Sequence, residues 1–328
     1  MTDYKAIFGR KIKVITSDPP ATVGKGEVWY NSPAANFKTS VKVEAWSSGT
    51  VYPAANRMGF ASGTQTAGLY ASGYLGTPPP SNLMLATSFE YDGSSWTAGD
   101  DVNNIRFIGG SCGTQTSSLM MGGNMPTGAQ RGEVEEYNGT SWSEQSDLPT
   151  GVQANVGAGI QTAALSISGG ADTDITQEYD GSSWTAGGDI NTARTKGFGS
   201  GTQTAGMYAG GDGILTAVEQ YDGSSWTTSP ASLGAGQAGY SSTNVGTSSR
   251  DTTIVAGGAA GSPASNTGVT QIYDGSTWRT APAMATAREI SLTGDSTAAL
   301  AVAGFTSTNV TTVEEFSATD TVKTITDS

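Results

Sequence analysis

The sequence predicts an all-β chain that folds as a six-bladed β-propeller, with four antiparallel strands per blade and a small β-rich segment before the first blade. One motif occurs five times, beginning with "EYDGSSWTAG" at Glu90–Gly99 and again at Glu178–Gly187. Trp46, Trp96, Trp142, Trp184, Trp226 and Trp278 follow one another at intervals of 50, 46, 42, 42 and 52 residues. A period of this length is typical of propellers and solenoids. The 46 glycines among 328 residues favour short strands and tight turns.

The N-terminal segment, residues 1–42, differs from the rest in pattern and charge. It alternates as a strand in "KIKVIT", breaks at "SDPP", and continues as a hairpin in "GEVWYNSPAANFKTS". It contains seven Lys and Arg and three Asp and Glu, a net charge of +4. The net charge of the whole chain is −13, so the remaining residues carry −17. We expect this segment to attach to a partner or a sister subunit, with Trp29 as the apolar anchor beside Tyr30 and the lysines as the rim. The alternative is that it covers the base of the propeller.

Each later period contains signals for four strands, labelled a to d from the inside outwards. A Gly-rich run leads into a "GTQT" turn, as at Gly63–Thr66, and an apolar run that ends in small residues follows, as in "LMMGG" at Leu119–Gly123. After a variable loop come a tyrosine strand, an Asp-Gly or Asn-Gly turn and the tryptophan strand. Asp-Gly and Asn-Gly tolerate the positive φ of a type I′ hairpin turn. A sheet this rich in glycine buries its faces only by packing radially against copies of itself.

The repeats number six, and the ring needs both ends of the chain to close. Trp46 has no complete blade before it, and Glu289–Phe316 has strands a to c with no tryptophan after them. We therefore expect a d strand near Val43–Ser47 to complete the C-terminal blade, which places the propeller at residues 43–328. The alternative donor of that strand is "TVKTIT" at Thr321–Thr326.

A glycine doublet followed by a tyrosine and then a tryptophan, once per blade, resembles the kelch repeat over about residues 43–317. Tyr91 and Trp96 are five residues apart, closer than in most kelch repeats. This compact form, with "GEVWYN" near the N-terminus, resembles kelch-like proteins of tailed bacteriophages, especially marine ones. The resemblance implies a virion protein in a tail, tail fibre or other external appendage, present as a homo-oligomer and bound to other virion proteins through residues 1–42.

The residue types present argue against most enzyme chemistry. The chain has no histidine and one cysteine, Cys112, which excludes histidine-ligated copper or zinc sites and a Ser-His-Asp triad. The repeated carboxylates Glu90, Glu136, Glu178 and Glu315 are spread around the ring and do not form one catalytic pair. We expect no enzyme activity, cofactor or metal. A glycan-active propeller of sialidase or lyase type and a free kelch-type scaffold are the alternatives. The acidic body argues against nucleic acid binding, and no apolar run is long enough to span a membrane.

Two features are candidates for binding. Ten or eleven residues after each tryptophan stands a long hydrogen-bond donor: Arg57, Arg106, Gln153, Arg194, Gln237 and Arg288. Such a ring either grips a carbohydrate or carboxylate, or donates to carbonyls of neighbouring blades. The variable b–c loops share one face with the d–a loops, and Gly73–Leu85, with Tyr74 and Pro78–Pro80, is our candidate for contact with a host surface glycan or protein.

Overall fold

The computed structural model describes residues 4–7, 10–20, 28–76, 83–125, 128–170, 172–239, 244–245, 249–261 and 265–325. The chain divides into two compact units, Met1–Ala45 with Ser317–Ser328, and Trp46–Phe316. The C-terminal boundary differs from the expected 43–328, because the last strand runs on past the propeller and Ser317–Ser328 group with the N-terminal segment.

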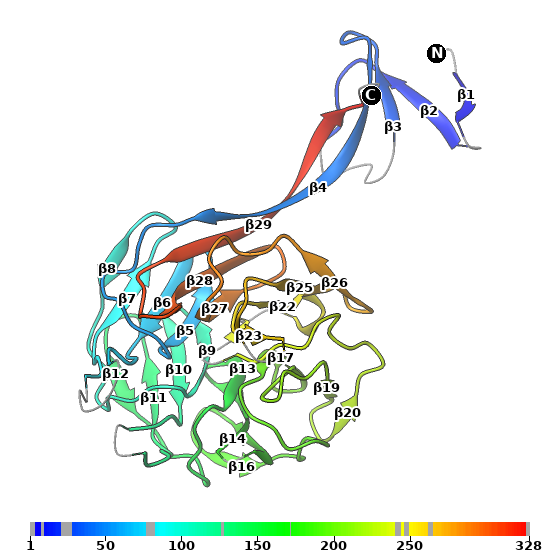
Figure 1. Ribbon diagram of the computed structural model, residues 1–328. Helices are drawn as coiled ribbons and strands as arrows, with labels where there is room; N and C mark the ends of the chain where they lie inside the picture. The colour runs from blue at the N-terminus through cyan, green and yellow to red at the C-terminus, as the bar shows by residue number, and fades with distance from the viewer. Residues whose placement is uncertain are drawn as a thin grey trace. The chain divides into compact units, whose positions relative to one another are not determined.

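The second unit confirms the predicted fold class: it is a six-bladed β-propeller of antiparallel blades (Figure 1). Blades one to four each contain four strands in sequence order. Blade one contains β5 (Phe60–Thr64), β6 (Ala67–Ala71), β7 (Ser88–Tyr91) and β8 (Trp96–Ala98). Blade two contains β9 (Gly110–Thr114), β10 (Ser117–Met121), β11 (Val134–Tyr137) and β12 (Trp142–Glu144). Blade three contains β13 (Val156–Ile160), β14 (Ala163–Gly169), β15 (Thr173–Tyr179) and β16 (Trp184–Ala186), and blade four contains β17 (Phe198–Thr202), β18 (Ala205–Ala209), β19 (Val218–Tyr221) and β20 (Trp226–Thr228).

Blade five is irregular at its inner edge. Its sheet contains β22 (Ile254–Ala256), β25 (Thr270–Tyr273) and β26 (Trp278–Ala281), beside the short hairpin β23 (Ala259–Ala260) and β24 (Ser265–Asn266) and the single-turn 3₁₀ helix η1 (Arg250–Thr252). The preceding strand, β21 (Asn244–Val245), instead pairs in parallel with β17 of blade four. It also contacts the inner strands of blades one, two, three and six, so it lies at the centre of the ring.

Blade six combines the two ends of the chain. Its strands are β27 (Glu289–Gly294), β28 (Ala298–Phe305), β29 (Val313–Thr324) and the end of β4 (Asn36–Ser48), in that order. The Gly49 amide donates to the Val313 carbonyl at 3.0 Å. The Trp46 ring lies 5.3 Å from that of Phe316, and its indole N–H donates to Thr270 Oγ1 of blade five at 3.0 Å. Trp46 therefore takes the place that the other blades give to their own tryptophan.

The first unit contains β1 (Tyr4–Ile7), β2 (Arg10–Ile15), β3 (Val28–Asn31) and the beginning of β4, followed by the far part of β29. β2 and β3 are parallel, and β3 and β4 form a hairpin that pairs Asn31 with Asn36. Within this unit β4 and β29 are antiparallel, since the Ile325 amide donates to the Phe37 carbonyl and Thr321 Oγ1 to the Val41 carbonyl.

The residues that repeat in the sequence hold one blade to the next. The glutamine of each "GTQT" turn donates to the carbonyl at the tyrosine position of the preceding blade, as Gln115 does to Tyr91 at 2.8 Å and Gln65 to Phe316 at 2.7 Å. The tyrosine hydroxyl donates to the glutamate before the preceding blade's tyrosine, as Tyr137 does to Glu90 at 2.7 Å. Blade four carries Gln220 at the glutamate position and donates to Tyr273. These contacts explain why the motif is repeated almost letter for letter.

The backbone conformation, as well as packing, explains why glycine doublets occur at these positions. Both residues of each doublet have positive φ, as in Gly122 (65°) and Gly123 (111°). A Cβ on Gly123 would lie 2.9 Å from the Phe107 carbonyl oxygen. Ser72, Ser168 and Ala303 adopt the left-handed region at the first position in blades one, three and six. The expected close approach of sheets therefore accounts for only part of the glycine requirement.

Candidate functional site

The two faces of the propeller use different residues. On one face the "GTQT" and Asp-Gly turns meet: a Cβ on Gly93 would lie 3.3 Å from Thr66, and the same contact recurs at Gly181 and Thr162. On the other face the b–c and d–a loops pair, through bridges such as Arg57 with Tyr74 and Phe107 with Asn124. The loops are thus grouped as the sequence predicts. Pro78–Pro80 lie outside the described residues, and Tyr74 is partly buried.

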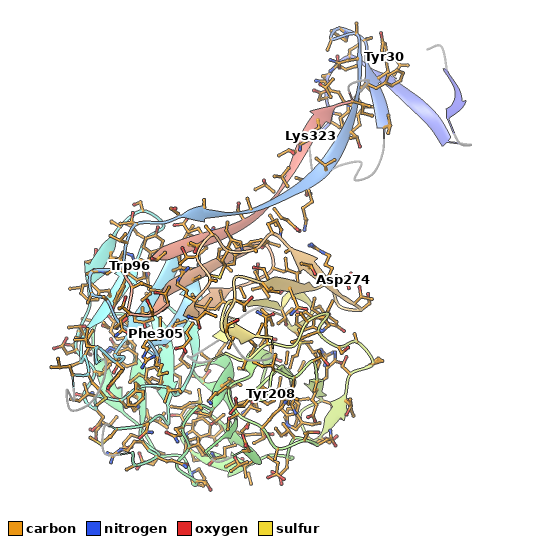
Figure 2. All side chains as sticks on the ribbon, viewed as in Figure 1. Tyr30, Trp96, Tyr208, Asp274, Phe305 and Lys323 are labelled. Atoms are coloured by element: carbon orange, nitrogen blue, oxygen red, sulfur yellow. The ribbon has the colours of Figure 1, made fainter. Side chains whose placement is uncertain are left out.

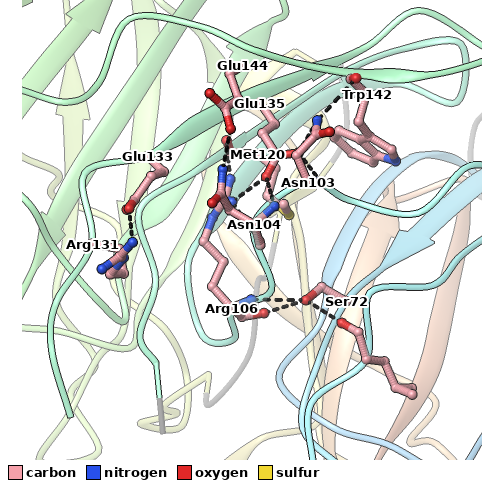
Figure 3. Close-up of polar contacts among 11 residues, drawn as sticks. Ser72, Asn103, Asn104, Arg106, Met120, Arg131, Glu133, Glu135, Trp142 and Glu144 are labelled. Carbon is pink, nitrogen blue, oxygen red and sulfur yellow. Dashed lines mark hydrogen bonds and ion pairs between the residues drawn. The ribbon is translucent and has the colours of Figure 1, made fainter. Parts of the chain in front are cut away.

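Three of the four candidate arginines are buried and bound inside their own blades. Arg106 Nη1 donates to Glu135 Oε1 at 2.6 Å and to the Asn104 carbonyl, and Nη2 donates to the Met120 carbonyl (Figure 3). The side chains of Arg106 and Glu135 are 1% and 0% exposed. Arg194 pairs in the same way with Glu219, and Arg288 with Glu314. These arginines are therefore structural. Their carbonyl acceptors lie in their own blade, which corrects the alternative that they donate to neighbouring blades.

For four of the donors, Arg106, Arg194, Gln237 and Arg288, the partner stands two residues before the tyrosine position of the same blade. The arginines of blades two, four and six face Glu135, Glu219 and Glu314. Blade five has glutamine at both positions, and Gln271 Nε2 donates to Gln237 Oε1 at 2.5 Å. Blade three differs, because Gln177 bonds to the Thr150 backbone and Gln153 accepts from Asn124. The sequence contains this matched exchange, but the ring of donors considered alone does not reveal it.

Arg57 of blade one is the exception, because it stands one position later than the other arginines. Its backbone pairs with Tyr74 as that of Phe107 pairs with Asn124, so Asn56 occupies the place of Arg106 in this blade, and Phe89 that of Glu135. Its guanidinium carbon lies 4.2 Å from the ring centre of Phe305, which ends β28 (Figure 2), and 5.7 Å from that of Tyr74. Its Nη1 is 3.7 Å from Glu289 Oε2, an ion pair too long for a hydrogen bond. The side chains of Arg57 and Glu289 are 20% and 13% exposed. Of the four candidate arginines, Arg57 alone therefore reaches solvent on the loop face.

The surroundings of Arg57 form what we call the mouth cluster, contributed by blades six, one and two. Tyr74 packs on Phe107 with ring centres 5.2 Å apart, and Asn309 Nδ2 donates to the Tyr74 carbonyl at 2.8 Å. Asn124 bridges to Phe107 and donates to the Gln153 side chain. The members of the mouth cluster are Arg57, Tyr74, Phe107, Asn124, Glu289, Phe305 and Asn309.

A belt of peptide hydrogen bonds runs beside the mouth cluster, from blade to blade. Ile108 donates its amide to the Met58 carbonyl at 2.8 Å, Ala154 to Ile108 at 2.6 Å, and Lys196 to Ala154 at 3.2 Å. Met58, Ile108, Ala154 and Lys196 all have φ between 55° and 59°, and non-glycine residues in this region carry strain. Lys196 Nζ also pairs with Asp212 at 3.1 Å. The belt fixes the starting points of the inner strands.

Glu289 begins the inner strand of blade six. Burial raises its pKa, and the positive charges of Arg57 and Lys196 act in the opposite direction. The carboxylates that repeat around the ring have a different role, since Glu90, Glu136, Glu178 and Glu315 each accept a hydrogen bond from a tyrosine of the next blade.

The structure also corrects the role expected for Trp29. Its side chain is 3% exposed, and its indole N–H donates to Asp18 Oδ1 at 3.1 Å. Asp18 accepts further bonds from Asn31 and Lys38, which lower its pKa to about 2. Trp29 is therefore a core residue of the first unit instead of an exposed anchor, because the "SDPP" turn supplies a carboxylate for its N–H. Tyr30 is partly buried against Phe37, which is 36% exposed.

The sequence matches no protein-family model and no curated protein. Among solved structures, one titled "Structure of YjhT" is similar, with a TM-score of 0.65 and 16% identity, over 84% of this chain and all of that one. A likeness at this identity supports the propeller fold alone. Among the residues described, no group of three or more His, Cys, Asp or Glu is placed to hold a metal, and no helix is long and apolar enough to cross a membrane.

Proposed function

We propose that this chain is a non-enzymatic structural protein of a tailed-phage virion, in a tail, a tail fibre or another external appendage. In this proposal the propeller is a rigid module that presents its loop face to the host surface, and the N-terminal segment attaches it to other virion proteins in a homo-oligomer. The phage assignment is supported by the resemblance of the repeat, which remains a prediction.

One observation favours a binding module on this fold: the repeated residues make the contacts between blades, whereas the variable residues lie on the loop face. Gln115, Tyr137 and their equivalents are occupied in contacts between blades. The loop face instead carries residues that occur once, among them Tyr74, Phe305 and Arg57. A rigid ring with a single variable face is a common arrangement for recognition by loops.

The contact surface of the first unit must exclude Trp29, since that side chain is buried. Val28 (39% exposed) and Phe37 (36%) are the exposed large apolar side chains described on β3 and β4. They are the better candidates for an apolar contact with a partner, with Tyr30 at its edge.

Mass spectrometry of purified phage particles tests the proposal. We expect the chain to be present in stoichiometric amounts, and Phe37→Ser to reduce its incorporation while the purified protein keeps its thermal midpoint. Absence from washed particles would refute the virion assignment. Release of reducing ends from host polysaccharide by the purified protein would instead support the glycan-active alternative.

A further inference from the structure

The mouth cluster contains an unusual concentration of buried polar atoms that lack a hydrogen bond. Four of its side chains carry one each: Arg57 Nε, Asn124 Oδ1, Glu289 Oε2 and Asn309 Oδ1. Buried polar atoms in native proteins are nearly always paired with protein, water or ligand, so each exception needs an explanation. Arg194 and Arg288 form the contrast, because their Nε atoms donate to the carbonyls of Gly210 and Ala303, each at 2.9 Å.

The unpaired atoms define the chemistry that would satisfy them. Three are acceptors, from Asn124, Glu289 and Asn309, and one is a donor, Arg57 Nε. A matching ligand has several O–H donors and at least one acceptor. The charges of Arg57 and Glu289 cancel, and an anionic ligand would meet the Glu289 carboxylate. The polar complement is therefore a neutral polyhydroxylated molecule.

The apolar part of the cluster fits the same class of ligand. Tyr74, Phe107 and Phe305 are partly exposed aromatic side chains beside these polar atoms. Sugar rings combine hydroxyl groups at their edges with C–H faces, and a few polar groups set among aromatic side chains are typical of small-ligand sites. We propose that the mouth cluster is a subsite for a neutral saccharide unit, which rests on the proposed function and deepens it by naming the class of surface glycan.

Binding requires one movement, and Arg57 is the side chain placed to make it. The four unpaired atoms are themselves covered by protein. Arg57 is held over Phe305 by a cation–π contact and by the 3.7 Å ion pair. Since no hydrogen bond fixes its guanidinium, the Arg57 side chain turns on ligand binding, and exposes its own Nε and the Glu289 carboxylate to ligand hydroxyls.

The test uses the full-length protein and a panel of defined probes. Maltoheptaose, β-1,4-mannohexaose and a galacto-oligosaccharide represent neutral glycans, and polygalacturonate and heparin represent acidic ones. Binding is measured by glycan array and then by calorimetry for the wild type, Arg57→Gln, Glu289→Ala and Tyr74→Ala. Arg131→Gln is the matched control, since Arg131 pairs with Glu133 in a b–c loop of the same face and removal of its charge leaves the mouth cluster intact.

We expect at least one neutral probe to bind, with affinity reduced tenfold or more by each change in the mouth cluster and less than twofold by Arg131→Gln. Thermal midpoints show that each variant is folded. Binding of acidic probes alone, equal losses in Arg131→Gln and Arg57→Gln, or no binding across the panel would each overturn the inference. The chain's presence in particles without saccharide binding refutes this inference alone, whereas saccharide binding by a chain absent from particles refutes the virion proposal alone.

Discussion

The buried pair Arg106–Glu135 offers a direct test of how the blades are held together. The chain itself contains the replacement, because blade five has Gln237 and Gln271 at the equivalent positions. We therefore predict that Arg106→Gln and Glu135→Gln are each strongly destabilising, and that the double substitution is milder than either single one.

The magnitude follows from what each change leaves behind. Arg106→Gln leaves a carboxylate that is 0% exposed, and Glu135→Gln leaves a guanidinium that is 1% exposed. An uncompensated buried charge of this kind costs about 3–5 kcal/mol. Glu135 also accepts from the Asn103 amide at 2.7 Å, and a glutamine retains that acceptor, as Gln271 does toward the Ala235 amide. The double variant then loses one or two hydrogen bonds of about 1 kcal/mol each.

The measurement is urea unfolding followed by tryptophan fluorescence, with a double-mutant cycle on the midpoints. A coupling of several kcal/mol is expected between the two positions. Arg131→Gln, which breaks a more exposed pair, should cost less than about 1 kcal/mol and is the control. If the double variant lost as much stability as the two single variants added together, the two positions would not be coupled. The view that Gln–Gln in blade five replaces Arg–Glu in other blades would then be refuted.

Four further predictions concern the repeat and the ring. Tyr179→Phe removes a 3.1 Å hydrogen bond between blades and should lower the free energy of unfolding by about 1 kcal/mol, measured by thermal unfolding. Glu136→Gln should flatten the pH dependence of stability. Burial raises the pKa of Glu136, so the stabilising contribution of this side chain is lost as pH rises through that value. Gly123→Ala should lower the stability by more than about 2 kcal/mol, because φ is 111° and the Phe107 oxygen would lie 2.9 Å from the new Cβ. Gly128→Ala has no atom within 4 Å of the new Cβ and should cost about 1 kcal/mol. Equal losses of stability in the two variants would contradict the packing argument. Deleting residues 1–50 removes Trp46 from blade six and should lower the midpoint of the whole propeller, while deletion of residues 1–35 leaves it; equal midpoints would show that Trp46 does not close the ring.

The fold could be predicted from the sequence because its signals are local and repeated. The tyrosine strand, the Asp-Gly or Asn-Gly turn and the tryptophan strand lie within ten residues, and five copies reduce the effect of any one misreading. The inner edge of blade five was not predictable in the same way, since residues before η1 lack the "GTQT" turn and β21 pairs with blade four. The extension of β29 past Phe316 was not predicted either, because its pairing partner is β4 at the other end of the chain.

The candidate site was predicted less well, for a physical reason. Long polar side chains ten or eleven residues after a tryptophan look alike in a sequence, yet Arg57 stands one position later in its blade than Arg106 does. The burial of Arg106, Arg194 and Arg288 also depends on a glutamate about 25 to 30 positions away. Trp29 is a similar case, since an aromatic side chain in a basic segment suggests an interface, whereas the structure shows Asp18 accepting its N–H. In both cases the deciding residue is the hydrogen-bond partner, which the type of the first residue does not reveal.

The repeat offers a way to separate structural from functional residues without related sequences. Where one copy departs from the motif, a second departure can compensate: Ile272 replaces the glutamate where Phe316 replaces the tyrosine, and in blade five Gln237 and Gln271 together replace an Arg–Glu pair. Such matched changes preserve contacts between or within blades, so selection for stability explains them. Arg57 has no such match: it lies at the position that Phe107 takes in blade two and Glu289 in blade six, and no described residue supplies a hydrogen bond to its buried Nε. A departure that stability does not compensate needs another cause, and a ligand at the mouth cluster is the cause that the surrounding residues support.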